Sequence, residues 1–289
     1  MRQALIFLAA LPALFLGSAC AAGNAGDNGR LKVIAVTTQI GDFTRNVGGD
    51  SISLTVLLKP NQDAHDFEPA PSQARSLANA DLILRNGLGL DGFVEKATRG
   101  SSAKIVTVSS AIEAHVEDGE PDPHVWFSVA NAKLMVASIR DALASADSAN
   151  AQAYRDNAAK YLGRLDQLDA QIKREVETIP SACRKLVTNH DVLGYYAEAY
   201  GFEVVGSVIA SISTEARASA SDVANVVRLI KAERVPAIFA ETSVNPGLIR
   251  QVGKEAGVKV VDDLYGGTYV GMMETNTKKI VEALKSCPS

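Results

Sequence analysis

The sequence is poor in the residues that several classes of protein need. It has 289 residues, of which three are cysteine and one is tryptophan, and aromatic residues make up only 6%. The 29 basic and 33 acidic residues give a net charge of −4. Without a basic excess to neutralise phosphates, or many aromatic rings to stack on bases, the chain is not expected to bind nucleic acid.

The remaining composition is that of an ordinary globular protein. Apolar residues make up 47% and charged residues 21%, which is typical of a folded chain with one large or two medium domains. The sequence contains neither an HExxH nor a GxSxG motif, the signatures of zinc-dependent proteases and of many serine hydrolases. We therefore predict that the protein is not an enzyme.

Only one run of residues is apolar enough to insert into a membrane, and it lies at the N-terminus. Ala4–Leu16, about 13 residues, is too short to span a hydrocarbon core of ~30 Å comfortably and is typical of a signal peptide. Small residues at 19–21 offer a cleavage site. We predict a signal peptide over residues 1–21 and export to the periplasm or extracytoplasmic cell envelope. Two alternatives are a retained short anchor and a lipid on Cys20, although Gly17 stands where lipoproteins normally carry Leu.

Two cysteines remain once Cys20 is set aside with the N-terminal segment. Cys183 and Cys287 form an even pair in a chain that we expect to be exported to an oxidising compartment. We predict a disulfide bond between them, which would close a loop of about 100 residues and contribute ~4–5 kcal/mol in the chain-entropy model. Two buried free thiols are the alternative.

Short β-branched runs alternate with helical patterns along most of the chain. The expected strands before residue 150 are Lys32–Val36, Ser53–Leu58, Leu82–Asn86 and Lys104–Val108. Those after residue 180 are Lys185–Thr188, Glu203–Val208, Ala237–Ala240 and Val258–Val261. Strand–helix alternation predicts an α/β fold with mostly parallel sheets and right-handed crossovers.

A long amphipathic pattern separates the two groups of strands. Apolar residues recur at steps of three and four from Asn150 to Ile179, and Pro180 follows. We prefer one rigid backbone helix packed across two lobes to a coiled coil, because a coiled-coil seam would need more sustained heptads. The predicted organisation is a signal peptide (1–21), a flexible leader (22–30), an N-terminal α/β lobe (31–147), a linking helix (148–180) and a C-terminal α/β lobe (181–289).

Three of the four histidines lie where they could meet in one cleft. His65 and His190 each follow a predicted strand, as does the acidic pair Asp262–Asp263, and His124 lies in a loop just before a helix. Parallel α/β sheets bind ligands beyond the carboxyl ends of their strands. Three imidazoles and one carboxylate form a complete first shell for a divalent transition metal such as zinc. Taken singly, each residue is better explained as a solvated loop side chain or a helix cap.

Four motifs in order surround these residues: HDFEP at His65, DPHVW at His124, NHDVLGYYAEAYG at His190, and DDLYG at Asp262–Gly266. With them, the stretch from about Lys32 to Leu284 resembles the metal-binding solute-binding proteins of bacterial zinc and manganese ABC transporters (cluster A-I type). The resemblance implies two α/β lobes joined by a rigid helix, with one metal held between them.

The resemblance also implies the ligands and the partners. The metal would be held by His65, His124, His190 and an aspartate, which the family spacing to the following Gly places at Asp263, with Asp262 as the fallback. The protein would deliver its metal to an ABC permease in the cytoplasmic membrane, and a metallochaperone is a further candidate partner. We expect a monomer.

The third histidine favours zinc over manganese. Manganese-selective members of the family tend to carry Glu where this chain has His190, and more nitrogen with less oxygen favours zinc. We therefore predict a high-affinity extracytoplasmic zinc-binding protein for metal import, with Zn²⁺ as transported ligand. A manganese-binding protein of the same transporter type is the first alternative. A zinc hydrolase, which would keep a water on its metal, and an adhesin with a structural metal are the others.

Two further features have two interpretations each. The segment 113–120 contains one histidine and four carboxylates, where many zinc-binding members carry a long His-rich loop. It could capture metal weakly, but a solvated acidic loop is the better explanation. Glu241, at the end of a predicted strand, either supports a metal ligand or is an ordinary strand-end acid.

Overall fold

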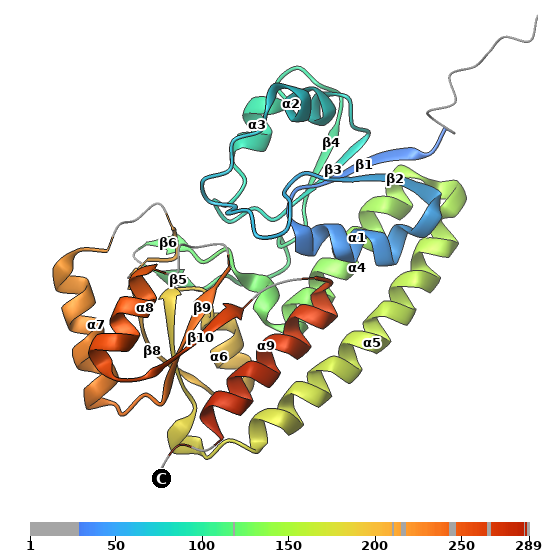
Figure 1. Ribbon diagram of the computed structural model, residues 1–289. Coiled ribbons are helices and arrows are strands. Elements are labelled where there is room, and N and C mark those ends of the chain that lie inside the picture. Colours follow the sequence, from blue (N-terminus) through green and yellow to red (C-terminus); the bar gives the residue numbers. More distant parts are fainter. Residues whose placement is uncertain are drawn as a thin grey trace, which may run out of the picture. The chain divides into compact units, whose positions relative to one another are not determined.

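The computed structural model contains two parallel sheets, each with helices on both faces (Figure 1). It describes residues 29–117, 119–209, 211–214, 218–242, 247–264, 267–285 and 287, apart from the side chain of Asp263. The predicted signal peptide, Cys20 and the predicted leader up to residue 28 lie outside the described residues. Within the described part of the chain, no helix combines the length and the apolar character needed to cross a bilayer.

The first sheet has the strand order β2-β1-β3-β4, and all its pairs are parallel. Its strands are β1 (Leu31–Ala35), β2 (Ile52–Val56), β3 (Leu82–Arg85) and β4 (Lys104–Thr107). Helices α2 (Pro71–Ala78) and α3 (Phe93–Ala97) pack on one face, and α1 (Thr38–Gly48) and α4 (Val129–Ala146) lie on the other. Alternate residues of β1 accordingly enter two different apolar clusters, as the pleat of a strand requires.

The second sheet has the order β10-β9-β7-β8 and is also fully parallel. Its strands are β7 (Lys185–His190), β8 (Glu203–Ile209), β9 (Ala237–Glu241) and β10 (Lys259–Leu264). Helices α7 (Ala220–Ala232) and α8 (Gly247–Ala256) cover one face, and α6 (Gly194–Tyr200) and α9 (Tyr269–Leu284) cover the other.

Helix α5 (Ala151–Glu177) joins the two lobes and is 27 residues long. Its buried stripe packs against α1 and α4 beside the first sheet and against α9 beside the second, within one continuous apolar cluster (Figure 1). The predicted α/β fold of two lobes joined by one long helix is confirmed. The helix is slightly shorter than the predicted Asn150–Ile179. Asn150 belongs to the 3-10 turn before it, and the backbone N–H groups of Thr178 and Ile179 donate to carbonyls three residues earlier instead of four.

The shorter elements differ more from the sequence-based expectation. The segment predicted as an acidic loop contains an antiparallel hairpin of β5 (Val116–Glu117) and β6 (Glu120–Pro121). The 3-10 turns are η1 (Gly49–Ser51), η2 (Val125–Phe127), η3 (Ser148–Asn150) and η4 (Ser181–Cys183). Strands β7 and β10 both run further than predicted, so that His190 and the pair Asp262–Asp263 belong to strands instead of following them.

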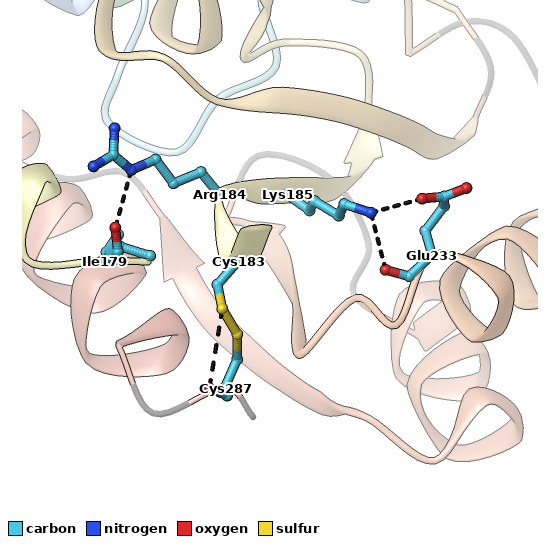
Figure 2. Close-up of a disulfide and its surroundings, with 6 residues drawn as sticks. All are labelled: Ile179, Cys183, Arg184, Lys185, Glu233 and Cys287. Atoms are coloured by element: carbon cyan, nitrogen blue, oxygen red, sulfur yellow. Dashed lines mark hydrogen bonds and ion pairs between the residues drawn. A yellow bond between two sulfur atoms is a disulfide. The ribbon is translucent and has the colours of Figure 1, made fainter. Parts of the chain in front are cut away.

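A disulfide bond closes the second lobe, as predicted. Cys183 in η4 is joined to Cys287, just after α9, with the two Cα atoms 6.2 Å apart and a sequence separation of 104 (Figure 2). Nearby, Lys185 at the start of β7 donates to the carbonyl and carboxylate oxygens of Glu233. The C-terminal end of the chain is thus tied to the segment that leaves α5.

Candidate metal centre

Three histidines from distant parts of the chain converge on one point. His65 lies in the loop after β2, His124 directly precedes η2, and His190 is the last residue of β7. The Nε2 atom of His124 lies 3.3 Å from Nε2 of His65 and 3.4 Å from Nε2 of His190. One nitrogen from each ring can be chosen so that all three lie within 4.8 Å of one another.

Local turns present these rings to one another. The Asp63 carboxylate accepts a hydrogen bond from the backbone N–H of His65 at 2.9 Å, and Asp122 does the same for His124 at 2.9 Å. An aspartate two residues before the donor forms a tight side-chain turn. The Asn86 side chain donates to the carbonyl of Pro123 at 3.0 Å and holds the second turn against the first sheet.

Two buried carboxylates lie behind two of the rings. Asp122 Oδ1 is 2.7 Å from Nδ1 of His124 and forms a hydrogen bond with it. Glu241 Oε1, at the end of β9, is 2.6 Å from Nδ1 of His190, although the two groups are not aligned for an ideal hydrogen bond. A carboxylate at Nδ1 favours the tautomer that carries its proton there. The Nε2 lone pairs of both rings are then free to bind a metal.

The three rings perturb one another electrostatically. Burial, together with the positive charge that His124 and His190 can carry, lowers the pKa of His65 to about 4. Burial also opposes the charging of His190, but Glu241, Asp63 and Asp191 together outweigh this effect, so the pKa of His190 is raised. The site therefore has one ring that resists protonation and one that attracts a proton.

A bound cation would stabilise a cluster of facing lone pairs. The cavity lined by the three histidines has a volume of about 60 Å³, whereas pockets for small organic ligands usually measure ~300–1,000 Å³. An ion with a few waters fits this volume, and an organic solute does not. Imidazole nitrogen is intermediate between hard and soft ligands, and three such nitrogens suit a divalent transition metal.

Of the two candidate carboxylate ligands, the structure describes the side chain of Asp262. The carboxylate of Asp262 accepts from the guanidinium of Arg250 at 3.3 Å, and among the described residues Asp262 is not part of the histidine cluster. Asp263 lies in β10, and its side chain is outside the described part of the chain.

The fourth histidine occupies a separate place. His115 stacks on Tyr195 with ring centroids 4.0 Å apart, and its Nε2 lies 2.7 Å from a carboxylate oxygen of Glu198. It does not belong to the three-histidine cluster.

Sequence reasoning missed the role of Asp122, although a signal was present. The DPH tripeptide indicates a turn, and an aspartate that accepts from the backbone of His124 is also close enough to reach its ring. Glu241, which the sequence offers as either a support for a metal ligand or an ordinary strand-end acid, contacts His190. The sequence does not indicate which ligand it contacts, because that depends on the pairing of β9 with β7.

Comparisons with known proteins agree with this geometry. A profile of the family described as "Zinc-uptake complex component A periplasmic" matches residues 33–283. The manganese-binding lipoprotein MntA of Bacillus subtilis is 34% identical over 309 aligned positions, which cover 99% of this chain and 100% of that protein. The manganese ABC transporter substrate-binding lipoprotein PsaA of Streptococcus anginosus is 29% identical over 291 positions, 92% of this chain and 94% of that protein.

Solved structures give the same result. The periplasmic zinc binding protein TroA of Treponema pallidum superposes with a TM-score of 0.82 at 31% identity, covering 88% of this chain and 99% of that one. These likenesses confirm the predicted metal-binding role, the extracytoplasmic location and the absence of an enzymatic function. The chain belongs to the family of periplasmic zinc-uptake component A, the metal-binding solute-binding proteins of ABC transporters.

Proposed function

We propose that this protein captures Zn²⁺ outside the cytoplasm and delivers it to an ABC permease. His65, His124, His190 and Asp263 are the proposed ligands. Three nitrogens and one carboxylate oxygen make a four-coordinate site without an open position, which suits capture and release better than hydrolysis.

The distances from Nε2 of His124 to Nε2 of His65 and to Nε2 of His190 are the observation that carries the proposal. Two nitrogens each about 2.05 Å from a tetrahedral zinc ion lie about 3.3 Å apart. The spacings from His124 to the other two rings are 3.3 and 3.4 Å. Asp263 is proposed as the fourth ligand because the neighbouring Asp262 carboxylate is paired with Arg250.

Manganese is the second candidate, and the names of the relatives favour it. MntA and PsaA are named for manganese, whereas TroA is named for zinc. The donor set favours zinc, because manganese prefers oxygen ligands and binds a given nitrogen-rich site more weakly.

Competition between the two ions tests the proposal. Metal-free protein, titrated with each ion against a chelator of known affinity, should bind zinc at least about tenfold more tightly than manganese. Zinc affinity should fall by orders of magnitude in His65→Ala and His190→Ala, whereas His115→Ala is the matched control and should bind as the wild type does. Wild-type affinity in the first two variants would refute the site, and tighter manganese binding would establish the alternative.

Export is the second part of the proposal. We propose cleavage of a signal peptide over residues 1–21, with a lipid on Cys20 as the alternative. Mass spectrometry of the mature N-terminus separates the two, since a diacylated Cys20 would establish the anchor.

A further inference from the structure

A buried hydrogen-bonded group links the two lobes on the side of the site where His124 lies. The group, which we call the tyrosine clamp, consists of Asp42 in α1, Tyr161 in α5, Tyr269 at the start of α9, and the backbone carbonyl of Trp126 in η2. The hydroxyl of Tyr161 and the backbone N–H of Tyr269 both donate to Asp42 Oδ2 at 3.1 Å. The hydroxyl of Tyr269 donates to the Trp126 carbonyl at 2.7 Å.

Every contact of the clamp is sheltered from water. Asp42 is 6% exposed and Tyr269 1% exposed, and Phe43 packs edge-on against the ring of Tyr269 with centroids 4.7 Å apart. A buried carboxylate is costly unless donors surround it. Asp42 obtains one of its donors from the free N–H groups at the first turn of α9, where the helix dipole also favours a negative charge. These bonds hold one arrangement because breaking one leaves a buried polar group unpaired.

Tyr269 therefore makes two connections, one through its backbone N–H and one through its side-chain hydroxyl. Its backbone ties the first turn of α9 in the second lobe to α1 in the first lobe, and its hydroxyl holds the single turn of η2 that begins directly after His124. Trp126 is two residues from His124, and its ring packs edge-on against the imidazole at 5.6 Å between centroids. A shift of the Trp126 carbonyl would therefore move His124 relative to His190.

We propose that Tyr269 is a positioning residue for metal binding, which fixes the His124 loop of the first lobe against the second lobe through the tyrosine clamp. This inference rests on the proposed function, because it assigns the clamp to the same three-histidine site. Metal–nitrogen distances tolerate errors of only ~0.2 Å, so a small displacement of His124 lowers affinity even when the fold is intact.

Replacing Tyr269 with Phe tests the inference, because it removes only the hydroxyl that holds the Trp126 carbonyl. The matched control is Tyr196→Phe. Tyr196 is also 1% exposed, and its hydroxyl bonds Thr277 at 2.9 Å between α6 and α9, entirely within the second lobe. Both variants lose one buried tyrosine hydrogen bond, so their thermal stabilities should fall by similar amounts.

The readout is the zinc dissociation constant of metal-free full-length protein, measured by chelator competition well below the unfolding temperature. Tyr269→Phe should weaken zinc binding about tenfold, or about 1.4 kcal/mol, with most of the change in the dissociation rate. Tyr196→Phe should bind zinc as the wild type does. Asp42→Asn, which removes the carboxylate that holds α9, should also weaken binding, and it replaces Tyr269→Phe if that variant does not fold.

The outcomes separate this inference from the proposed function. A wild type that fails to bind zinc would refute the proposed function. A wild type that binds zinc, together with clamp variants that bind as tightly as Tyr196→Phe, would overturn the positioning role and leave the proposed function intact. Equal weakening in Tyr269→Phe and Tyr196→Phe would also overturn it, because a general loss of stability would then explain the effect.

Discussion

Replacing Glu241 with Gln should weaken zinc binding although none of the proposed ligands is replaced. Glu241 Oε1 lies 2.6 Å from Nδ1 of His190, and solvent hardly screens the pair because the side chains are only 2% and 3% exposed. The substitution removes the charge that keeps a proton on Nδ1. The new amide can also donate to Nδ1, which would move the ring proton to Nε2 and occupy the lone pair that a metal needs.

Loss of such a supporting partner typically costs ~10–100-fold in metal affinity, which corresponds to about 1.4–2.7 kcal/mol. The measurement is a zinc titration against a competing chelator at pH 7.5, followed by fluorescence. Trp126 is the only tryptophan and its ring packs against His124, so the signal comes from the site itself.

Glu198→Gln is the matched control for this experiment. It makes the same chemical change at a carboxylate 2.7 Å from a histidine nitrogen, but at His115, outside the cluster. Zinc affinity should be unchanged in Glu198→Gln. An affinity of Glu241→Gln within about twofold of the wild type would refute the reasoning, as would an equal loss in both variants.

Three further predictions concern pH and stability. Because the pKa of His190 is raised, a proton competes with zinc already above the ordinary imidazole pKa of ~6.5. Zinc affinity should fall by about tenfold for each pH unit below the raised pKa. A dissociation constant unchanged from pH 7.5 to 5 would contradict this. Replacing Cys183 and Cys287 with Ser should lower the free energy of unfolding by about 4 kcal/mol, which urea denaturation measures; equal stability would count against a structural role for the bond. Burial raises the pKa of Asp91 to about 6, so the folded state binds this proton more tightly than the unfolded state does. The stability of Asp91→Asn relative to the wild type should then fall by about 2 kcal/mol between pH 7 and pH 4. A difference independent of pH would exclude the assignment.

The fold was predictable because its signals are local. Each strand of the two sheets contains a short, mainly apolar run bounded by polar or helical sequence, and the apolar stripe of α5 extends over almost the whole helix. The β5–β6 hairpin was not predictable, since Val116–Glu117 and Glu120–Pro121 are too short to show alternation. The extra residues of β7 and β10 are polar except Leu264, and a strand predicted from its run of apolar residues stops at the first polar ones.

The site was predictable in its residues but not in its geometry. His65, His124 and His190 were chosen because each lies in a recognisable motif, yet no spacing along the chain indicates that their Nε2 atoms face one another. The clamp contacts of Asp42 were also hidden, because they join residues as far apart in sequence as 42 and 269. Such pairings depend on how α1, α5 and α9 pack, which follows from the whole core and not from any local pattern.

The three facing lone pairs have a consequence for the lifetime of the protein in the cell envelope. Empty, the cluster contains like partial charges held together by the surrounding fold, and a bound ion relieves that repulsion. Free ion at a hundred times its Kd would stabilise the folded state by about 2.7 kcal/mol. Proteases that attack unfolded chains would then degrade the metal-free protein faster than the metal-bound protein. We therefore expect the abundance of this protein to follow the supply of its own cargo, independently of any change in gene expression.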